Sequence, residues 1–417
     1  MKKPGFDTKS VHGDVLKEDI HKAIRYPIYA GVAFHFESAE DIEDAFAFRK
    51  PAHAYSRVTN PTVEAFERKM NGLEDGRAAV ATASGMAAIS NVFFNLLKQG
   101  ENIVSANSLF GNTYSFFKKT LKNFGIETRF VDIDDLDQVR EAINGKTRAL
   151  FLETISNPKM NVPDITKIVE IAREKREARD HGIAVIVDGT VTTPYLFKGK
   201  EFGVDLVVHS STKLISGGAT SIGGVIVDLG NCKWSGFPGL EDYKKLGELS
   251  FLARLRKEVY RDLGACMAPQ IAFLQSLGLE TLSLRVEKAC KNTLELAGYL
   301  ARHDKVIRVN YPGLPDSPFH DLAKKQFNNR FGGVLTFELP DKQTCFTFLN
   351  HLKIIRRASN LGDNTTLIIH PASTLFQEYT MEEKETMDVS EGLIRLSVGI
   401  EDVEDLMEDI EQALHKI

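Results

Sequence analysis

The chain has 417 residues, a net charge of −5 and no arginine-rich block, so its composition gives no sign of a nucleic-acid-binding protein. Its 43% hydrophobic and 26% charged residues are typical of a soluble globular protein, and its length is sufficient for two domains. No apolar run is long enough to span a bilayer, and no signal-peptide core follows the two lysines at the start. Four widely spaced cysteines, with no C-x-x-C pair, predict a reduced, cytoplasmic protein and no metal site.

The first sixty residues fit neither the helical nor the strand pattern that follows them. They include the segments PIYAGVAFHFESAEDI and HAYSRVTNPT. We predict that residues 1–60 form an extended arm that docks on another surface.

Short apolar runs alternate with helical segments over residues 61–264. The strands are expected at 78–83, 102–106, 127–133, 148–153, 183–188, 205–210 and 221–228. Such alternation predicts an α/β domain with a mostly parallel, doubly wound sheet buried on both faces.

The rhythm changes in the last part of the chain, residues 265–417. One or two long helices are expected over 269–304, strands at 332–339 and 393–399, and a final helix over 403–417. This part is predicted to be a smaller C-terminal α+β domain.

Polar and small residues stand where four of the predicted strands end. Ligands of open α/β sheets bind beyond the carboxyl ends of the strands, so these residues are expected to share one rim. They are Ser84, Gly85 and Met86 after the first strand, Asn157 after the fourth, Asp188 at the end of the fifth, and Ser210, Thr212 and Lys213 after the sixth. The helix start at 84–86 also offers free backbone N–H groups, which suit a phosphate.

This set of residues suits pyridoxal 5'-phosphate. That cofactor needs a lysine for an imine, an acid that keeps the ring nitrogen protonated, and a phosphate cradle. Each residue also has an ordinary alternative, because a lysine after a strand is usually exposed and Asp188 could cap a helix or form a turn. No G-x-x-x-x-G-K-[ST] loop is present, and the glycine-rich run at 217–224 leads into a strand, so neither ATP nor a dinucleotide is indicated.

Five motifs in fixed order carry a family resemblance. YSRVTNPT, ASGMAAI, ETISNPKMN, DGTVTTPYL and SSTKLISGGATSIGGVIVD together resemble the Cys/Met-metabolism family of pyridoxal-phosphate enzymes, and the likeness extends from about residue 5 to residue 414. Within that family, YRDLGACMAPQIAFLQSLGLETLSLRVEKACKN and EGLIRLSVGIEDVEDLMEDIEQAL are most similar to O-acetylhomoserine sulfhydrylases. The resemblance implies the fold of the aspartate-aminotransferase type, fold type I.

The resemblance also implies a role for each residue of the rim. Lys213 would bind the cofactor covalently and move protons, Asp188 would pair with the ring nitrogen, Asn157 would lie near the ring hydroxyl, and Phe110 would stack on the ring. The phosphate would be held by Ser84, Gly85, Met86, Ser210 and Thr212.

Two arm residues, Tyr55 and Arg57, are implied to reach the phosphate of a neighbouring subunit. Arginine's planar fork suits a phosphate, although an exposed arginine can also be a solvated surface charge. The expected assembly is therefore a homo-oligomer, a tetramer built from dimers with shared active sites.

Arg395 is a charged residue inside the apolar segment LIRLSVG, so it must be paired or bind an anion. An internal salt bridge is one interpretation. The resemblance favours the other, in which Arg395 holds the substrate's α-carboxylate through two parallel hydrogen bonds and Ser359 supports it.

The chain departs from the family at three places. Phe110 replaces a tyrosine, Gly189 an asparagine, and Leu375 with Phe376 a threonine and a histidine. A departing thiol, with a pKa of about 8.5, gains more from a proton donor than a carboxylate, with a pKa of about 4. The missing hydroxyl at Phe110 should therefore harm a C–S lyase more than a sulfhydrylase, unless Tyr114 substitutes.

The predicted reaction is a γ-replacement that uses two small molecules, an O-acylhomoserine and a sulfur donor. The acyl group leaves, sulfur adds at Cγ, and homocysteine or methionine is released. The alternatives are cystathionine γ-synthase, a C–S lyase acting on methionine or cystathionine, and a non-catalytic binding or scaffold protein on the same fold. No nucleic-acid or membrane partner is expected.

Overall fold

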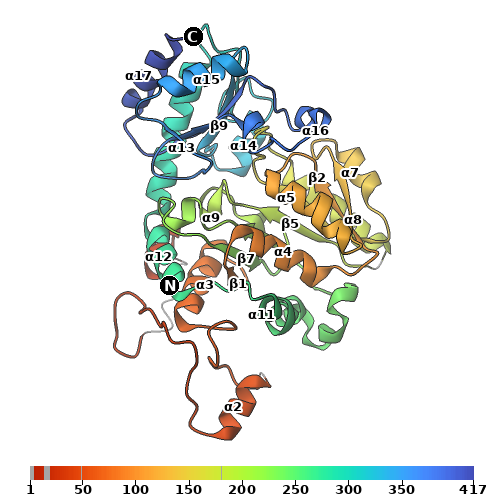
Figure 1. Cartoon of the computed structure of the whole chain (residues 1–417). Coiled ribbons are helices and arrows are strands. Elements are labelled where there is room, and N and C mark those ends of the chain that lie inside the picture. Colours follow the sequence, from red (N-terminus) through yellow and green to blue (C-terminus); the bar gives the residue numbers. More distant parts are fainter. Residues whose placement is uncertain (1–3, 14–18, 48, 180) are drawn as a thin grey trace.

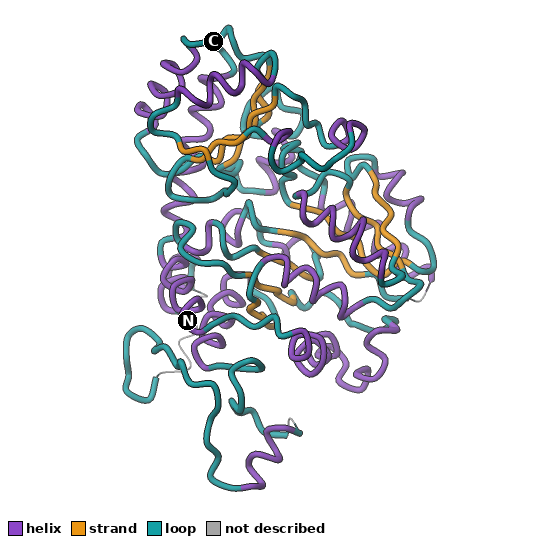
Figure 2. Tube along the Cα trace, in the orientation of Figure 1, coloured by secondary structure: helices purple, strands orange, loops and turns teal. Residues whose placement is uncertain are grey.

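Two β-sheets organise the chain, in a computed structural model that describes residues 4–13, 19–47, 49–179 and 181–417 (Figures 1 and 2). The larger sheet contains β1 (Ala78–Thr82), β2 (Asn102–Ala106), β3 (Glu127–Val131), β4 (Thr147–Glu153), β5 (Ala184–Asp188), β6 (Leu206–His209) and β7 (Gly224–Asp228). The smaller sheet contains β8 (Arg308–Asn310), β9 (Val334–Glu338), β10 (Arg356–Arg357), β11 (Leu367–Ile369) and β12 (Leu393–Ser397).

The larger sheet has the strand order β1-β7-β6-β5-β4-β2-β3. The strands from β6 to β3 in this order pair in parallel, and β7 is antiparallel to both of its neighbours. The central strands are buried, with Ala184–Val187 of β5 fully inaccessible. The predicted strands and the mostly parallel α/β fold are confirmed, and β7 is the exception to the parallel direction.

Helices alternate with the strands of the larger sheet. They are α3 (Pro61–Glu74), α4 (Gly85–Leu96), α5 (Gly111–Ser115), α6 (Leu121–Asn123), α7 (Leu136–Ala142), α8 (Ile165–Arg179), α9 (Thr193–Leu196), α10 (Ser250–Arg254) and α11 (Tyr260–Leu263). Local sequence explains their starts. Asn60 caps α3 by accepting hydrogen bonds from the backbone N–H groups of Thr62 and Val63, and Pro61 occupies the first helical position, where a missing N–H costs nothing.

The smaller sheet has the order β10-β11-β12-β9-β8 and is antiparallel except between β10 and β11. The helices of this part are α12 (Pro269–Glu280), α13 (Leu282–Leu300), α14 (His320–Gln326), α15 (Lys342–His351), α16 (Met381–Thr386) and α17 (Val403–Leu414). Helix α13 packs on β9 and α17. The sequence pattern found β9, β12 and α17 but not β8, β10 and β11, because two or three residues are too few for a readable alternation.

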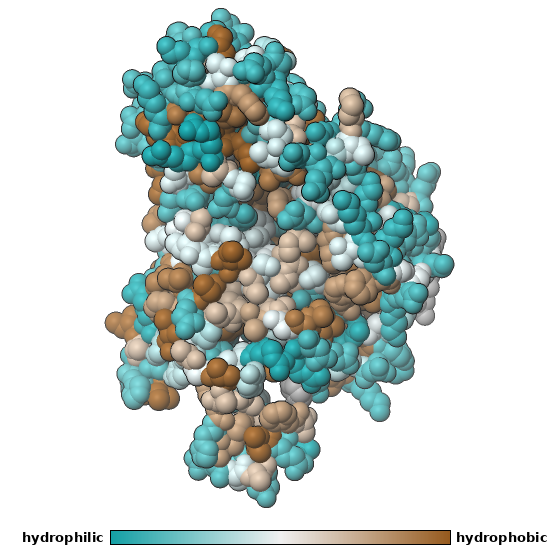
Figure 3. Space-filling model, viewed as in Figure 1, coloured by the Kyte–Doolittle hydropathy of each residue, from teal (hydrophilic) through white to brown (hydrophobic). Residues whose placement is uncertain are grey.

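The N-terminal segment has two parts. Helix α1 (Phe6–His12) packs on α3 and α12, whereas α2 (Ala39–Phe46) projects away from both sheets at the bottom of Figure 1. Residues 19–38 and 49–60 contain no helix or strand and are joined by one bridge between Ala33 and Tyr55. Large apolar side chains of this segment are exposed, among them Ile20, Ile24 and Phe46, and hydrophobic residues also gather over the lower half of the face in Figure 3. Exposed apolar surface of this kind is typical of interaction sites.

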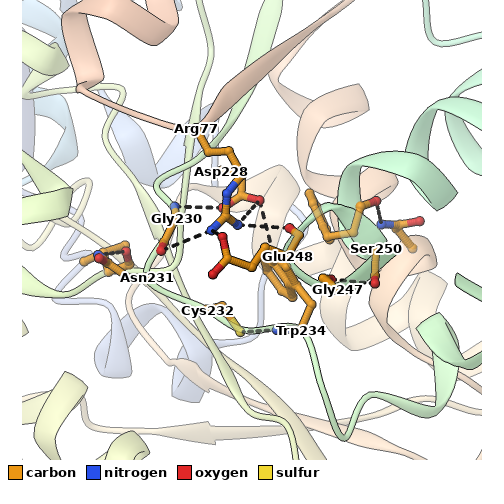
Figure 4. A network of polar contacts seen from close by, with 12 residues as sticks. Arg77, Asp228, Gly230, Asn231, Cys232, Trp234, Gly247, Glu248 and Ser250 are labelled. Atoms are coloured by element: carbon orange, nitrogen blue, oxygen red, sulfur yellow. Dashed lines mark hydrogen bonds and ion pairs between the residues drawn. The ribbon is translucent and has the colours of Figure 1, made fainter. Parts of the chain in front are cut away.

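A polar network fastens the segment that follows β7 to the edge of the larger sheet (Figure 4). The buried carboxylate of Asp228 accepts hydrogen bonds from Trp234 Nε1 at 3.1 Å and from the Gly230 N–H at 2.9 Å, and Arg77 Nη1 lies 3.4 Å from it. Arg77 also pairs with Glu248 at 2.7 Å. These contacts are structural and bridge β7 and the neighbouring edge strand β1.

Candidate active site

Lys213 follows β6 at the start of a short helical turn, Leu214–Ser216. Its side chain is half-buried, and Nζ donates a hydrogen bond to Asn360 Oδ1 at 2.6 Å. Burial, and next the positive charge of Arg395, lowers the pKa of Lys213 to about 8. About a tenth of the amine is therefore neutral at pH 7, far more than for an ordinary lysine, and the neutral amine is the state that attacks a carbonyl carbon.

The turn that carries Lys213 is held from outside by Arg285. This buried guanidinium donates to the carbonyl oxygens of Leu214 at 2.7 Å and Gly278 at 2.6 Å. A Cβ atom at Gly278 would lie 2.3 Å from the Ile215 carbonyl oxygen, so α12 approaches the turn as closely as only glycine permits. The Arg285 side chain and the close backbone of Gly278 thus both hold the turn that carries Lys213.

Asp188 is the last residue of β5, and Oδ1 accepts a hydrogen bond from the Thr190 N–H at 2.9 Å. Burial raises the pKa of Asp188, while the hydrogen bonds from Thr190 and the nearby His209 oppose the rise. Gly189 comes next, and a Cβ there would lie 2.7 Å from His209 Cε1. The ring of His209 therefore occupies the space in which a side chain at position 189 would begin.

The start of α4 forms a cradle beside Ser210. The Ser84 side chain caps the helix by accepting from the Ala87 N–H at 3.1 Å, while a Cβ at Gly85 would lie 2.6 Å from Ser210 Cβ. Met86 is the second residue of the helix, so the N–H groups of the first turn are available for a phosphate. The hydroxyl groups of Ser210 and Thr212 differ in their hydrogen bonds. The Thr212 hydroxyl donates to the Gly223 carbonyl oxygen at 3.1 Å and accepts from the Gly223 N–H at 3.0 Å.

Arg395 lies on β12 and is 2% exposed. Nη1 donates to Asn157 Oδ1 at 3.4 Å, Nη2 donates to the Asn360 carbonyl oxygen at 2.9 Å, and Nε has no partner. Burial lowers the pKa of Arg395 to about 10, so the group stays charged at neutral pH. Within the described residues it forms no ion pair, so the internal salt bridge is not observed, and its unpartnered Nε could bind an anion.

Ser359 does not occupy the predicted place. It is exposed and makes no hydrogen bond with Arg395 in the described structure, whereas its neighbour Asn360 contacts both Arg395 and Lys213. Asn360 could not be predicted from the sequence, because the turn SNLGD offers two adjacent polar side chains and only the backbone direction decides which one faces the rim.

Phe110 stands before α5, half-buried, and its backbone N–H donates to Glu153 Oε1 at 2.7 Å. Two phenols of neighbouring segments, Tyr114 and Tyr379, are engaged in other hydrogen bonds. The Tyr114 hydroxyl interacts with Lys118 and Glu383, and the Tyr379 hydroxyl donates to the Gly111 carbonyl oxygen at 2.5 Å.

Leu375 and Phe376 lie on the same side as α5. The Leu375 carbonyl oxygen would be 3.3 Å from a Cβ at Gly111, which follows Phe110 directly. Phe376 is only 1% exposed and packs edge-on against Tyr379, with the ring centroids 5.2 Å apart. Leu375 is half-buried, so it is the better candidate for an apolar wall.

Tyr55 and Arg57 are not brought to the rim within one chain. Both are exposed, the Arg57 guanidinium lies 5.4 Å from the Tyr55 ring centroid, and its Nη1 donates to the Arg261 carbonyl oxygen at 2.6 Å. In the described residues neither side chain contacts a residue of the rim.

Neither a metal site nor a membrane span is found in the described part of the chain. No group of three or more His, Cys, Asp or Glu side chains there is arranged to hold a metal ion. The helices described are all too short or too polar to cross a bilayer.

A lysine of lowered pKa, a half-buried acid and a helix N-terminus at the carboxyl edge of a doubly wound sheet are the features of enzymes that bind pyridoxal phosphate through lysine. The chain belongs to the Cys/Met metabolism PLP-dependent enzyme family, whose sequence model matches residues 7–415. Pyridoxal phosphate is therefore its cofactor, and the fold is that of fold type I enzymes.

Individual relatives carry several activities. The chain is 40% identical to O-acetyl-L-homoserine sulfhydrylase 1 of Thermus thermophilus, with 98% of this chain and 99% of the relative covered. It is 39% identical to an L-methionine gamma-lyase of Fusobacterium nucleatum, with 100% and 99% covered. A crystal structure from Campylobacter jejuni, described as an O-acetylhomoserine (thiol)-lyase with N'-pyridoxyl-lysine-5'-monophosphate, superposes with a TM-score of 0.93 at 35% identity, covering 99% of this chain and 100% of that one.

Three local observations fit the cofactor to this chain. The Lys213 amine has a lowered pKa, the start of α4 approaches Ser210 closely at Gly85, and Asp188 is a half-buried acid that forms no ion pair in the described residues. A pyridinium nitrogen would supply a cationic partner for Asp188, and a phosphate would supply an acceptor for the α4 N–H groups.

Proposed function

We propose that the protein exchanges the acyl group of an O-acylhomoserine, with O-acetyl-L-homoserine the favoured substrate, for a sulfur nucleophile and releases homocysteine or methionine. The observation that carries this choice is Phe110 at the ring-stacking position, with Tyr114 and Tyr379 engaged in other hydrogen bonds. Acetate leaves without a proton donor, whereas a thiolate benefits from one. The likeness to the Thermus sulfhydrylase supports the same choice.

Each rim residue has a task in this reaction. Lys213 holds the cofactor and moves protons at Cα and Cβ, and Asp188 keeps the ring nitrogen protonated. When bound, the cofactor withdraws electrons from the substrate and so makes those protons removable. Arg395, with Asn157 and Asn360 beside it, binds the α-carboxylate and orients Cα toward Lys213.

The phosphate and ring contacts complete the proposed site. Gly85 and Met86 donate backbone N–H groups to the phosphate, the Ser210 hydroxyl donates beside them, and Phe110 covers one ring face. Thr212 contributes only after its hydroxyl turns from Gly223. Ser84 shapes the cradle as the helix cap.

A C–S lyase is the second candidate, and the named L-methionine gamma-lyase relative favours it. Product analysis separates the two reactions. Purified enzyme with O-acetylhomoserine and sulfide or methanethiol should form homocysteine or methionine, and methionine or cystathionine alone should yield little ammonia and keto acid. If the keto acid is the main product and no acyl exchange occurs, the lyase replaces the sulfhydrylase.

Phe110→Tyr should shift the reaction preference toward elimination. A phenol at this position can donate a proton to a departing thiolate, so kcat/KM for cystathionine or methionine should rise about tenfold relative to the acyl-homoserine, a barrier change of about 1.4 kcal/mol. The measurement is the ratio of the two kcat/KM values. Phe116→Tyr, on the buried side of the same helical segment, is the control. An unchanged ratio with the cofactor still bound would remove the leaving-group argument.

The arm is proposed to complete the site of a second subunit. Tyr55 and Arg57 are exposed and outside their own rim, and apolar side chains of the arm are exposed beside them. We place residues 1–60 in this arm, 61–264 in the cofactor domain and 265–417 in the C-terminal domain. The proposed assembly is a tetramer built from two such dimers, in the cytoplasm as the cysteine pattern indicates.

Mixing the variants Arg57→Ala and Lys213→Ala should restore part of the activity. Arg57→Ala removes a charge-assisted phosphate contact of about 1.5–3 kcal/mol, and Lys213→Ala removes the lysine. In mixed dimers one site has both native groups, so activity returns after subunit exchange. Exchange is verified with differently tagged chains, and verified exchange without recovered activity contradicts the shared site.

A further inference from the structure

Glu153 is a buried acid at the rim that the roles above leave unexplained. It ends β4 and is 7% exposed, and it forms no ion pair within the described residues. Two other buried carboxylates in or next to this sheet have a cationic partner, Glu101 in Arg148 at 2.7 Å and Asp228 in Arg77 at 3.4 Å. A buried carboxyl group without a cation is costly as an anion and far less costly as a neutral acid.

The carboxyl group joins two loops that reach the ring. Oε1 accepts the Phe110 N–H at 2.7 Å, and the Asn157 N–H also hydrogen-bonds to the group. Phe110 and Asn157 follow different strands, β2 and β4, so this one side chain fixes the spacing between the stacking residue and the residue beside Arg395.

Asp188 lies directly opposite Glu153 in the parallel register of β4 and β5, which places both side chains on one face of the sheet. Burial and next the charge of Asp188 raise the pKa of Glu153 well above its usual value. Asp188 has more support as an anion, since Thr190 donates to it and His209 is near. The two acids therefore favour one proton between them, held on Glu153.

We propose that Glu153 is a positioning residue which, as a neutral acid, fixes Phe110 and Asn157 against the cofactor ring and leaves Asp188 as the ionised carboxylate at the ring nitrogen. The proposal rests on the pyridoxal-phosphate site and is independent of which sulfur compound reacts. The two carboxyl groups thus have different roles. Asp188 pairs with the charged ring nitrogen, and Glu153 fixes the positions of Phe110 and Asn157.

The test compares Glu153→Gln with Glu153→Leu. Glutamine is neutral and keeps the acceptor oxygen, so the apoenzyme should bind pyridoxal phosphate within about threefold of the wild type, with the same visible absorbance and the same pH titration of that absorbance. Leucine leaves two backbone N–H groups without an acceptor, so cofactor affinity should fall about 10- to 100-fold and the absorbance should shift.

Glu101→Gln is the matched control, because it also neutralises a buried glutamate of the same sheet, but one paired with Arg148. Its apoenzyme should melt at a lower temperature, while Glu153→Gln should not. If Glu153→Gln weakens cofactor binding as much as the leucine variant, Glu153 acts as an anion and the proposal is wrong. If Glu153→Leu does not fold, the comparison of Glu153→Gln with wild type and Glu101→Gln decides. Because the readout is cofactor binding, failed acyl exchange in the wild type would overturn the proposed reaction without touching this result.

Discussion

Lys213→Ala should lose the visible absorbance of the lysine-bound cofactor and reduce turnover by more than about 10³-fold. The variant lacks both the covalent attachment and the group that moves protons at Cα, and proton transfer by a positioned side chain alone contributes about 10²- to 10⁴-fold. The measurements are the absorbance spectrum and kcat with O-acetylhomoserine and sulfide. Retention of wild-type activity would contradict the site assignment.

Lys198→Ala is the matched control for this variant. Lys198 is also half-buried, and burial likewise lowers its pKa, but it bonds to the Leu73 carbonyl oxygen instead of standing at the rim. This variant should keep the cofactor absorbance. Loss of the absorbance in both variants would show that a buried lysine matters for folding and not for attachment.

Cofactor capture by the wild-type apoenzyme should also depend on pH. Only the neutral amine attacks the aldehyde, and the pKa of Lys213 is lowered to about 8, so the capture rate should rise as pH increases through about 8 and then level off. A lysine with an ordinary pKa would still be gaining rate well above pH 9. Stopped-flow absorbance after mixing apoenzyme with pyridoxal phosphate gives the profile.

The large sheet and the residues of the rim could be predicted from the sequence, because both follow from strong local patterns. The runs that became β4 and β5 are continuous apolar strands, and parallel strands place Asp188 and the residues after β6 at one edge. Lys213 and Arg395 could be predicted because a charged side chain beside or inside an apolar strand is costly unless it is paired or binds a ligand.

Residues that act through backbone contacts escaped the sequence analysis. Glu153, Arg285 and Asn360 show no pattern of their own, since their partners are N–H groups and carbonyl oxygens or side chains distant in the chain. Thr212 shows the reverse case, in which the residue type suits a phosphate but Gly223 already uses the hydroxyl. Tertiary contacts of this kind cannot be read from spacing.

Arg395→Met should abolish recognition of the substrate carboxylate while leaving the protein folded. Two charge-assisted hydrogen bonds of about 1.5–3 kcal/mol each are lost, so kcat/KM should fall by about 10²- to 10⁴-fold, mainly through KM. Arg395→Lys keeps the charge without the planar fork and should recover only part of the loss. The cofactor absorbance should stay, because Arg395 lies on β12 and contributes no contact to the phosphate cradle.

Stability and a truncated substrate separate this role from a structural one. Arg395 is buried without a carboxylate partner in the described residues, and burial lowers its pKa, so removing the charge should leave the melting temperature unchanged or raise it. The acyl ester of 3-aminopropanol is the substrate without its α-carboxylate. For the wild type, kcat/KM should be lower with this ester than with the full substrate, by about the factor that Arg395→Met loses on the full substrate. For Arg395→Met, kcat/KM should be the same with both substrates, because the carboxylate and the guanidinium form one interaction. Equal discrimination by both proteins would place the carboxylate away from Arg395, and a large fall in melting temperature would show that the guanidinium serves the fold.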